Sequence, residues 1–217
     1  MIFELFDPKA ETSIREGANL PHWYQAGVTY FVTFRTEDSI PTMVARLWYQ
    51  RRAEWLRRKG IQVDDPKWKD NFARLSRETQ REFHEAFSRE YLEYLDRGLG
   101  ACVLRRAELA QIVADSLLHF DGSRYFMGDF VVMPNHIHLL VCLLGDSGIE
   151  ELCYSWKKFT ATQINRQLEH KGRFWQEESF DHLLRTPEQF EATCRYIANN
   201  PHNARLAIGE YLHYQRK

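Results

Sequence analysis

The chain has 217 residues, a hydrophobic content of 44%, a formal net charge of −1 at pH 7 and a mean hydropathy of −0.53. These values suit a soluble globular chain of one domain, or of one domain with an insertion, and they exclude a protein that is basic over its whole surface. No signal peptide, no apolar run near the ~20 residues that span a bilayer and no Cys-x-x-Cys pair is found, so we expect a cytoplasmic protein without membrane contact, disulfides or a zinc site.

The N-terminal half predicts an arm, a strand, a helix and an insertion. Residues 1–26 contain prolines and a glycine that interrupt any long element, so we expect an N-terminal arm. Residues 28–35 are rich in β-branched and aromatic side chains, which indicates the first strand. A helix is expected over residues 41–59, ending at Gly60. Residues 61–100 are densely charged with both signs and carry apolar residues at helical spacing, which indicates an insertion of one or two exposed helices.

The helix expected over residues 41–59 carries a local cluster of positive charge. Its basic residues, set against one acid, are Arg46, Arg51, Arg52, Arg57, Arg58 and Lys59. Tryptophan and tyrosine interleave with them, and arginine next to aromatic side chains suits a nucleic-acid strand through phosphate contacts and base stacking. We predict that Arg51, Arg52 and Arg58 bind DNA. A solvated helix face over a buried aromatic stripe is the alternative.

The C-terminal half alternates between helices and strands. Its apolar patterns predict a helix over 105–120, strands over 125–133 and 136–144, a helix over 149–169, a strand within 174–184 and a helix from Pro187. Residues 207–217 are expected to form a C-terminal tail. The order of elements predicts an α+β fold: a ferredoxin-like split βαβ antiparallel sheet with helices on one face, plus the helical insertion.

Two histidines follow a predicted turn. Residues 131–141 read Val-Val-Met-Pro-Asn-His-Ile-His-Leu-Leu-Val, two apolar runs joined by Pro-Asn, which predicts a hairpin. Successive side chains of a strand point to opposite faces, so His136 and His138 share one face and Ile137 lies on the other. Two neighbouring imidazoles on a rigid strand can form half of a metal site. A pair of strand histidines at a sheet edge, without metal, is the alternative.

A second set of polar residues lies on the last predicted helix. Thr186 can cap this helix, and Pro187 suits its first position. Tyr196 and Asn200 are four residues apart, so they lie one turn apart on one helical face. Pro201 disfavours helical geometry at Asn200, which we therefore place at a frayed end with its amide available as a ligand. On helix chemistry alone, a surface tyrosine above a helix-ending asparagine also explains the pattern.

Three segments together resemble the single-tyrosine HUH transposases, and most closely their REP-associated tyrosine transposase branch. The segments are Pro-Asn-His-Ile-His-Leu-Leu-Val at 134–141, Phe-Trp-Gln-Glu-Glu-Ser-Phe-Asp-His at 174–182, and Tyr-Ile-x-x-Asn-Pro at 196–201. Ile137 supplies the hydrophobic residue between the two histidines of the HUH pattern. The resemblance implies a catalytic domain over residues 27–206, with a poor match between about 60 and 100.

The resemblance also implies roles for single residues. His136 and His138 would bind a divalent metal ion, with Asn200 at the position of the third ligand, and Tyr196 would be the nucleophile. A site of two imidazoles and an amide with open positions for substrate oxygen suits Mg²⁺ or Mn²⁺. By the same resemblance two lysines would face DNA phosphate, although from the residues alone they are surface lysines; they are Lys157 and Lys158.

We therefore expect a transposase: a metal-dependent single-stranded DNA endonuclease and strand transferase that cuts at DNA hairpins through a 5′-phosphotyrosine intermediate. It would act as a monomer or a homodimer, and it needs no ATP because one phosphodiester replaces another. The alternatives are a DNA-hairpin-binding protein that does not cut, and a metal-dependent phosphodiesterase that uses water as its nucleophile. A replication initiator or relaxase of the same superfamily is a further possibility, but no third histidine of a relaxase follows.

Overall fold

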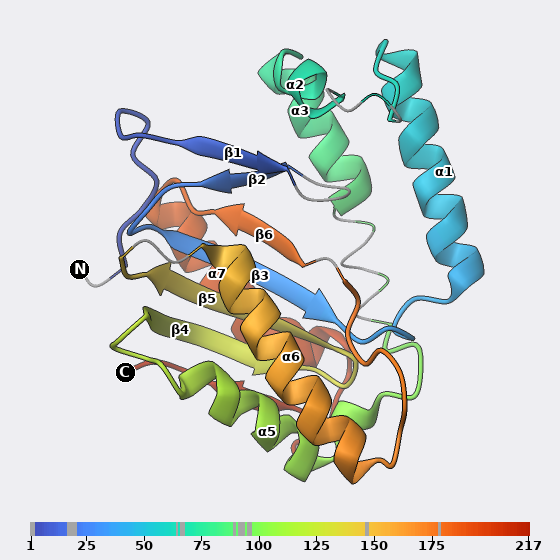
Figure 1. Cartoon of the computed structure of the whole chain (residues 1–217), viewed down its shortest axis with the longest axis vertical. Helices are drawn as coiled ribbons and strands as arrows, with labels where there is room; N and C mark the ends of the chain where they lie inside the picture. The colour runs from blue at the N-terminus through green and yellow to red at the C-terminus, as the bar shows by residue number, and fades with distance from the viewer. Residues whose placement is uncertain are drawn as a thin grey trace.

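The computed structural model describes residues 3–16, 21–63, 65, 68–88, 90, 94, 97–145, 148–177 and 179–217. Its centre is a five-stranded antiparallel sheet in the order β6-β3-β5-β4-β7 (Figure 1). The strands are β3 (Thr29–Arg35), β4 (Tyr125–Val132), β5 (His136–Leu143), β6 (Phe180–Leu183) and β7 (Leu212–Tyr214).

The two central strands, β3 and β5, are buried along their whole length. Both consist mainly of aromatic, β-branched and aliphatic residues, which suit a strand that is covered on both faces. Their register pairs Thr33 with His138 and Arg35 with His136, so these four side chains emerge on the same face of the sheet. β4 and β5 form the predicted hairpin, in which the Met133 N–H donates to the His136 carbonyl at 2.8 Å.

Helices cover both faces of this sheet. α5 (Ala107–Leu118) and α6 (Ile149–Gln167) lie in front of it in Figure 1 and pack against the odd-numbered residues of β5. α7 (Pro187–Asn203) packs on the opposite face, in a smaller core that contains Leu140 of β5. The α+β class, the antiparallel sheet and the split βαβ order are confirmed. The predicted placement of the helices on one face holds for α5 and α6, while α7 lies on the other face. Within the described residues, no helix combines the length and apolar character needed to cross a membrane.

A third apolar cluster lies between β3 and α5 in the sequence, in a group of helices that we call the helical unit. The unit comprises α1 (Thr42–Arg58), α2 (Trp68–Ala73), α3 (Arg77–Phe83) and the π-helical turn η1 (His84–Ser88). Figure 1 shows α1, α2 and α3 standing together beside the sheet. Their cluster contains Leu56, Ile61, Trp68, Phe72, Phe83 and Phe87. The unit therefore begins at α1, before the expected insertion, and the 3₁₀ turn η2 (Val103–Arg105) leads from it toward α5.

Short strands that the sequence does not predict occur near both ends of the chain. β1 (Ser13–Glu16) and β2 (Pro21–Tyr24) pair as a hairpin within the expected arm. β7 comes from the expected tail and pairs with the outer edge of β4. Each has only three or four residues. Such strands depend on hydrogen bonds from a partner strand, so no local periodicity marks them.

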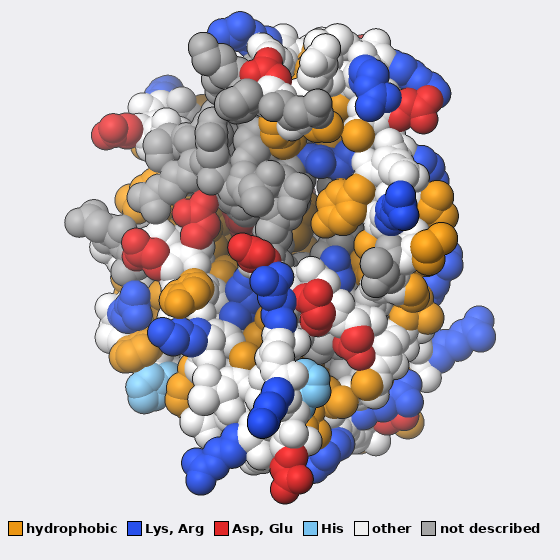
Figure 2. Space-filling view, turned by 45° about the vertical axis from the view of Figure 1, so that its right-hand side comes forward, with side chains coloured by type: hydrophobic (Ala, Val, Ile, Leu, Met, Phe, Trp, Pro, Cys, Tyr) orange, Lys and Arg blue, Asp and Glu red, His pale blue; other side chains and the backbone are white. Residues whose placement is uncertain are grey.

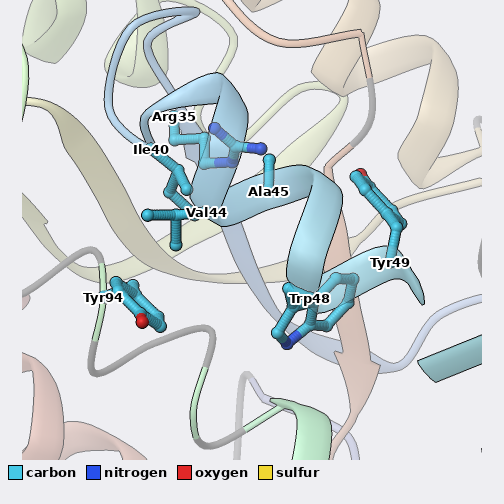
Figure 3. Close-up of a pocket in the computed structure, with 7 residues that line it drawn as sticks. All are labelled: Arg35, Ile40, Val44, Ala45, Trp48, Tyr49 and Tyr94. Carbon is cyan, nitrogen blue, oxygen red and sulfur yellow. The ribbon is translucent and has the colours of Figure 1, made fainter. Parts of the chain in front are cut away.

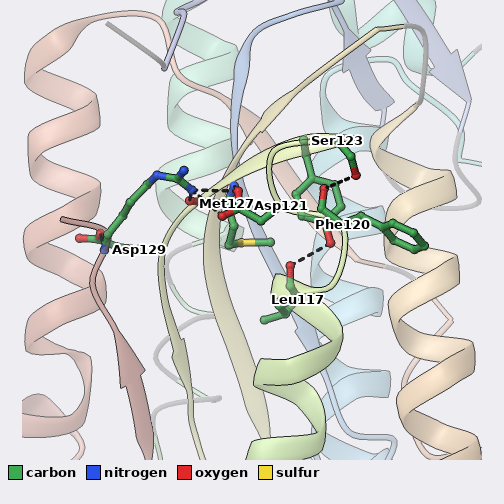
Figure 4. A network of polar contacts seen from close by, with 8 residues as sticks. Leu117, Phe120, Asp121, Ser123, Met127 and Asp129 are labelled. Carbon is green, nitrogen blue, oxygen red and sulfur yellow. Dashed lines mark hydrogen bonds and ion pairs between the residues drawn. The ribbon is translucent and has the colours of Figure 1, made fainter.

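A polar network fixes the chain end that follows β7 to β4 (Figure 4). Nη1 of Arg216 donates to both carboxylate oxygens of Asp121, at 2.9 and 3.0 Å, and to the Met127 carbonyl at 2.5 Å. The backbone N–H of Arg216 donates to the carboxylate of Asp129 at 3.0 Å. A three-residue strand is thereby held at the sheet edge by contacts outside its own β-ladder.

Candidate active site

His136 and His138 lie side by side on β5, on the face of the sheet that α7 covers. Both side chains are fully buried, and their Nε2 atoms are 3.0 Å apart. The period of two in a strand predicts that they share a face, and the structure confirms this. The two imidazoles can therefore present nitrogen atoms to a single point.

Burial removes the positive charge from both imidazoles. It lowers the pKa of His136 from 6.5 to about 3, because the surroundings do not solvate the imidazolium. It also lowers the pKa of His138 well below its usual value, and repulsion from His136 adds to this effect. Both rings are therefore neutral at pH 7, and a neutral imidazole is the form that binds a metal ion.

Each ring is also held through its Nδ1 atom. The side-chain oxygen of Asn135 is 2.7 Å from Nδ1 of His136, and the Thr33 hydroxyl is 2.7 Å from Nδ1 of His138. With both Nδ1 atoms engaged, the two Nε2 atoms are left to face each other. Sequence reasoning missed these two supporting residues. In the sequence, Asn135 indicates only a turn. Thr33 is identified by the register between β3 and β5, which pairs it with His138.

Tyr196 reaches the same point from α7. Its hydroxyl oxygen is 3.2 Å from Nε2 of His138, and its ring packs against the rings of His138 and Phe31 at centroid distances of 5.1 and 5.9 Å. The helix begins as predicted, with the Thr186 side chain accepting the Gln189 N–H at 3.2 Å. The fold thus places the hydroxyl of Tyr196 beside His138, whose Nε2 atom also contacts His136.

Asn200 lies one turn after Tyr196, about 6 Å further along the helix axis, and its side chain is fully buried. The expectation of a frayed end at Asn200 is wrong, because α7 continues through Pro201 to Asn203. The Asn200 carbonyl still accepts the Ala204 N–H at 3.0 Å. Pro201 removes one backbone hydrogen bond, and the burial of this turn against the sheet offsets that loss.

The donor atoms fit a divalent ion that accepts both nitrogen and oxygen ligands. Two nitrogens that each lie about 2.1 Å from one ion, at right angles, are about 3.0 Å apart, which matches the Nε2 separation of 3.0 Å. Among the described residues, no three His, Cys, Asp or Glu side chains gather in one place. The role of Asn200 as the third ligand stays a prediction from the resemblance. Mixed ligands with positions left for substrate oxygen suit Mg²⁺ or Mn²⁺.

Arg52, which was predicted to bind DNA from the surface of α1, is buried. Its side chain is 5% exposed, and its guanidinium lies over the rings of Trp68 and Phe83, at 5.0 and 5.4 Å from their centres. The prediction that Arg52 binds DNA is therefore wrong. The charge pattern of α1 indicated a surface residue, but aromatic rings from α2 and α3 cover this position and stabilise the guanidinium by cation–π contact.

The outer side of α1 keeps other basic and aromatic side chains exposed. Figure 2 shows basic and hydrophobic side chains on this side of the molecule. Arg51 and Arg58, which were predicted to bind DNA, are exposed and each forms an ion pair with a glutamate. Arg46 and Tyr49 line an open depression of about 540 Å³ along the helix. Sequence reasoning counted Arg46 in the basic cluster without singling it out; its spacing of three residues from Tyr49 was the available signal.

The two predicted lysines of α6 lie on the helix that covers the other face of the sheet from Tyr196. Nζ of Lys157 donates to the carbonyls of Glu177 and Gln176, at 2.6 and 3.4 Å, and so fastens the segment before β6. Lys158 is exposed, with Nζ 5.6 Å from the centre of the Tyr154 ring. The fold therefore does not place either lysine beside Tyr196.

A small cavity separates the end of β3 from the start of α1 (Figure 3). Arg35, Val44, Trp48 and Tyr94 are among the residues that line it. Its volume of about 10 Å³ gives room for one water molecule at most. Arg35 donates a hydrogen bond to the Ser39 hydroxyl at 3.0 Å, which ties β3 to the loop before α1. The cavity is thus a packing gap rather than a ligand site.

Comparisons with known proteins identify one similar solved structure and no family. No model of a known protein family matches the chain, and no curated protein matches it. Among solved structures, the chain is similar to one described as "Structure of the REP associates tyrosine transposase bound to a REP hairpin". The TM-score is 0.44 at 15% sequence identity, over 83% of this chain and 70% of the other. This likeness is too weak to assign a function, which is inferred below from the residues of the site.

Proposed function

We propose that this protein is a metal-dependent single-stranded DNA endonuclease and strand transferase, a transposase of the single-tyrosine HUH type. The observation that carries the proposal is the contact between the Tyr196 hydroxyl and Nε2 of His138, 3.2 Å apart, next to a second imidazole. A phenol oxygen beside two neutral, converging imidazoles pairs a nucleophile with nitrogen ligands for a cation. The order of the three sequence segments that resemble this family supports the same chemistry.

In the proposed reaction the phenol oxygen of Tyr196 attacks the phosphorus of a DNA phosphodiester. A bond forms between phosphorus and the phenol oxygen, and the bond to the 3′ oxygen of the preceding nucleotide breaks. The phenol loses one proton and the departing 3′ oxygen gains one, so the products are a 5′-phosphotyrosine and a free 3′-OH. A different DNA 3′-OH reverses the step and joins a new strand.

His136 and His138, with Asn200 as the candidate third ligand, would hold the ion required for this step. When bound, a divalent cation supplies positive charge beside the phosphate and offsets the charge that develops in the transition state. The packing of Tyr196 against Phe31 and His138 holds the phenol ring in place before DNA binds. This preorganisation lowers the entropic cost of bringing nucleophile and phosphate together.

Every residue assigned to this step belongs to one chain. The contact of the Tyr196 hydroxyl with a histidine of its own chain supports a site formed within one protomer. We therefore propose that a monomer is competent for cleavage, and that cleavage rate per molecule does not depend on protein concentration.

Covalent capture tests the proposed nucleophile. Labelled single-stranded hairpin DNA is incubated with the protein and Mn²⁺, and the mixture is separated by denaturing SDS electrophoresis. A protein–DNA band is expected for the native chain and is expected to vanish in Tyr196→Phe. The control, Tyr154→Phe, removes an exposed hydroxyl on the far side of the sheet and should keep the band. A band of native intensity in Tyr196→Phe would overturn the assignment.

The same experiment separates the alternatives. Cleavage without a covalent band, unchanged in Tyr196→Phe, would favour a phosphodiesterase that uses water. Hairpin binding without any cleavage would favour a protein that binds DNA and does not cut it. Hairpins are the chosen probe because the resemblance of the three sequence segments implies them.

Substitution of the histidines tests the proposed metal ligands. His136→Ala and His138→Ala should lose Mn²⁺-dependent cleavage while keeping most of the affinity for hairpin DNA. Removing a ligand should weaken Mn²⁺ binding by more than the ~10–100-fold that removal of a supporting residue costs. The check is a calorimetric Mn²⁺ titration beside a DNA-binding assay, and native Mn²⁺ affinity in either variant would disprove the ligand assignment.

The exposed side of α1 is the proposed contact for the DNA strand. Arg46→Glu and Arg57→Glu replace exposed arginines of this face, so hairpin affinity should fall. The slope of log affinity against log salt should shrink by about 0.7–0.9 for each phosphate that the variant no longer neutralises. Lys171→Glu makes the same kind of charge change at an exposed position outside α1 and serves as the control. Equal losses of affinity in all three variants would indicate general charge repulsion instead of a binding face.

A further inference from the structure

Asn135, the residue before β5, contacts a segment that we call the strap. The strap comprises residues 97–102 and leads out of the helical unit. The Nδ2 atom of Asn135 donates to the Leu99 carbonyl at 2.8 Å. Its Oδ1 atom lies 2.7 Å from Nδ1 of His136. The side chain of Asn135 is fully buried, so neither contact is shared with bulk solvent. One amide therefore touches both the strap and a proposed metal ligand.

These two contacts determine which nitrogen of His136 carries the proton. A carbonyl oxygen only accepts hydrogen bonds, so the atom of Asn135 that faces Leu99 must be the NH₂ group. The atom that faces His136 is then the amide oxygen, which also only accepts. Nδ1 of His136 must therefore be the N–H donor, and in a neutral ring Nε2 keeps its lone pair. That lone pair points toward Nε2 of His138, 3.0 Å away.

The contact that supports His138 is of a different kind. The Thr33 hydroxyl, 2.7 Å from Nδ1 of His138, can donate or accept a hydrogen bond. Thr33 is therefore compatible with either neutral form of His138, whereas Asn135 permits only one form of His136. Asn135 therefore restricts the tautomer of its histidine and Thr33 does not, and it is Asn135 that contacts the strap.

The strap itself has little freedom to move. The Ala101 N–H donates to a carboxylate oxygen of Asp38 at 2.7 Å. Gly100 has a φ of +91°, and a Cβ atom there would lie 2.7 Å from the Asp38 carbonyl oxygen. A side chain at position 100 would therefore push the strap away from Asp38, and the adjacent carbonyl of Leu99 would move with it.

We propose that Asn135 is a positioning residue that holds His136 in the tautomer able to bind a metal ion, and that the strap sets this residue in place. Where it concerns metal affinity, the inference rests on the proposed function, because it takes His136 as a ligand. The strap thereby makes the end of the helical unit a structural support of the site, although the unit has its own apolar cluster.

The tautomer of His136 can be measured directly in the metal-free protein. Long-range ¹H–¹⁵N correlation spectra of histidine-labelled protein distinguish Nδ1–H from Nε2–H. Native protein should show His136 as Nδ1–H, and Asn135→Ala should show a mixture. Asn135→Asp keeps an acceptor for Nδ1 but loses the donor to the Leu99 carbonyl, so Nδ1 of His136 should keep its proton while the contact with the strap is lost. This variant also covers the case in which the alanine variant fails to fold. Nε2–H in native protein, or no change in Asn135→Ala, would overturn the proposal.

A second pair of variants tests the strap at a distance from the site. Gly100→Ala should weaken Mn²⁺ binding by roughly the 10–100-fold that removal of a supporting residue costs and shift the His136 nitrogen signals. Gly60→Ala is the matched control, because φ is +79° there and no atom lies within 4 Å of the added Cβ. Equal behaviour of the two variants would show that backbone strain alone, and not the strap, causes any effect.

The outcomes for this inference and for the proposed function are separate. If native protein binds no Mn²⁺, the proposed metal dependence fails, while the tautomer spectra still decide the role of Asn135. If native protein binds Mn²⁺ and forms the covalent DNA adduct, but Asn135→Ala leaves the spectra and the Mn²⁺ affinity unchanged, the role of Asn135 fails and the function stands.

Discussion

His136 and His138 occupy the first and third positions of a central strand, in a buried part of the sheet that is usually filled by apolar residues. Burial keeps both rings neutral, and their neighbours satisfy the ring nitrogens instead of water. Such an arrangement is expensive in the absence of a role, because each buried polar group must find a fixed partner. The burial of the two rings should therefore make the free energy of unfolding depend on pH.

Acid should unfold the protein through these two histidines. Their folded pKa values lie below the unfolded value of about 6.5, and that of His136 is about 3. Below pH 6.5 the unfolded chain therefore binds more protons than the folded chain, so stability falls as the pH drops from 6.5 toward 3. The slope should approach about 1.4 kcal/mol per pH unit for each histidine.

Urea unfolding between pH 7 and pH 4 checks this dependence, with a chelator present. The double variant His136→Asn, His138→Asn removes both titrating rings and should show a much flatter profile over that range. If the native chain and the double variant lose stability in parallel, the acid sensitivity belongs to other groups.

At the residue scale the sequence predicts contacts that follow from local periodicity. The alternation of a strand places His136 with His138, and one helical turn relates Tyr196 to Asn200. Arg52 and Thr33 could not be placed in the same way. Their partners lie far along the chain, on α2 and α3 for Arg52 and on β5 for Thr33, and no local pattern encodes such pairs.

At the scale of single elements, the C-terminal strand β7 forms the shortest ladder of the sheet and relies on contacts outside that ladder. β7 has three residues, and the Arg216 network adds to the short ladder that pairs it with β4. The side chains of Arg216 and Asp121 are 23% and 22% exposed, so solvent screens their ion pair less than a surface pair. Removing one partner leaves a half-buried carboxylate with fewer donors.

Arg216→Ala should lower the free energy of unfolding by about 1–3 kcal/mol, because a charged hydrogen-bond donor is removed from a half-buried site. Arg195→Ala is the matched control, since Arg195 forms an ion pair with Glu191 whose side chains are 66% and 69% exposed. That change should cost no more than about 1 kcal/mol. Chemical denaturation of both variants is the measurement, and equal losses of stability would contradict a special role for the network.

The long elements could be predicted and the short ones could not. α5, α6, β4 and β5 carry enough apolar residues at a regular period to be found from the sequence. β1, β2 and β7 owe their existence to partner strands. The end of α7 was misjudged for a related reason, because the rule against helix before proline is local and the burial of Pro201 is tertiary.

At the scale of the whole molecule, the protein has separate apolar clusters in the sheet domain and in the helical unit. The sequence indicated an insertion from its dense mixed charge, but not that α1 packs with it. The aromatic residues of α1 find their partners on α2, α3 and η1, which pattern alone does not assign.

Arg52→Ala should therefore destabilise the helical unit more than the sheet. Removing a buried cation–π interaction should cost about 2 kcal/mol, and the effect should appear as faster amide hydrogen exchange in α1 than in β5. Arg57→Ala, at an exposed position of the same helix, should change exchange little. Uniformly faster exchange across α1 and β5 in Arg52→Ala would show that the two parts unfold as one.

The points at which the helical unit leaves and rejoins the sheet domain touch each other, as the hydrogen bond between Asp38 and Ala101 shows. Because its two ends are adjacent, the helical unit can be lengthened, shortened or replaced without shifting the register of any strand. The entropy of closing a loop rises only slowly with its length. The strap lies at that junction and contacts Asn135. If Asn135 positions His136 as proposed, a change in the size of the helical unit would leave the register of the strands intact and still reach His136 through this junction.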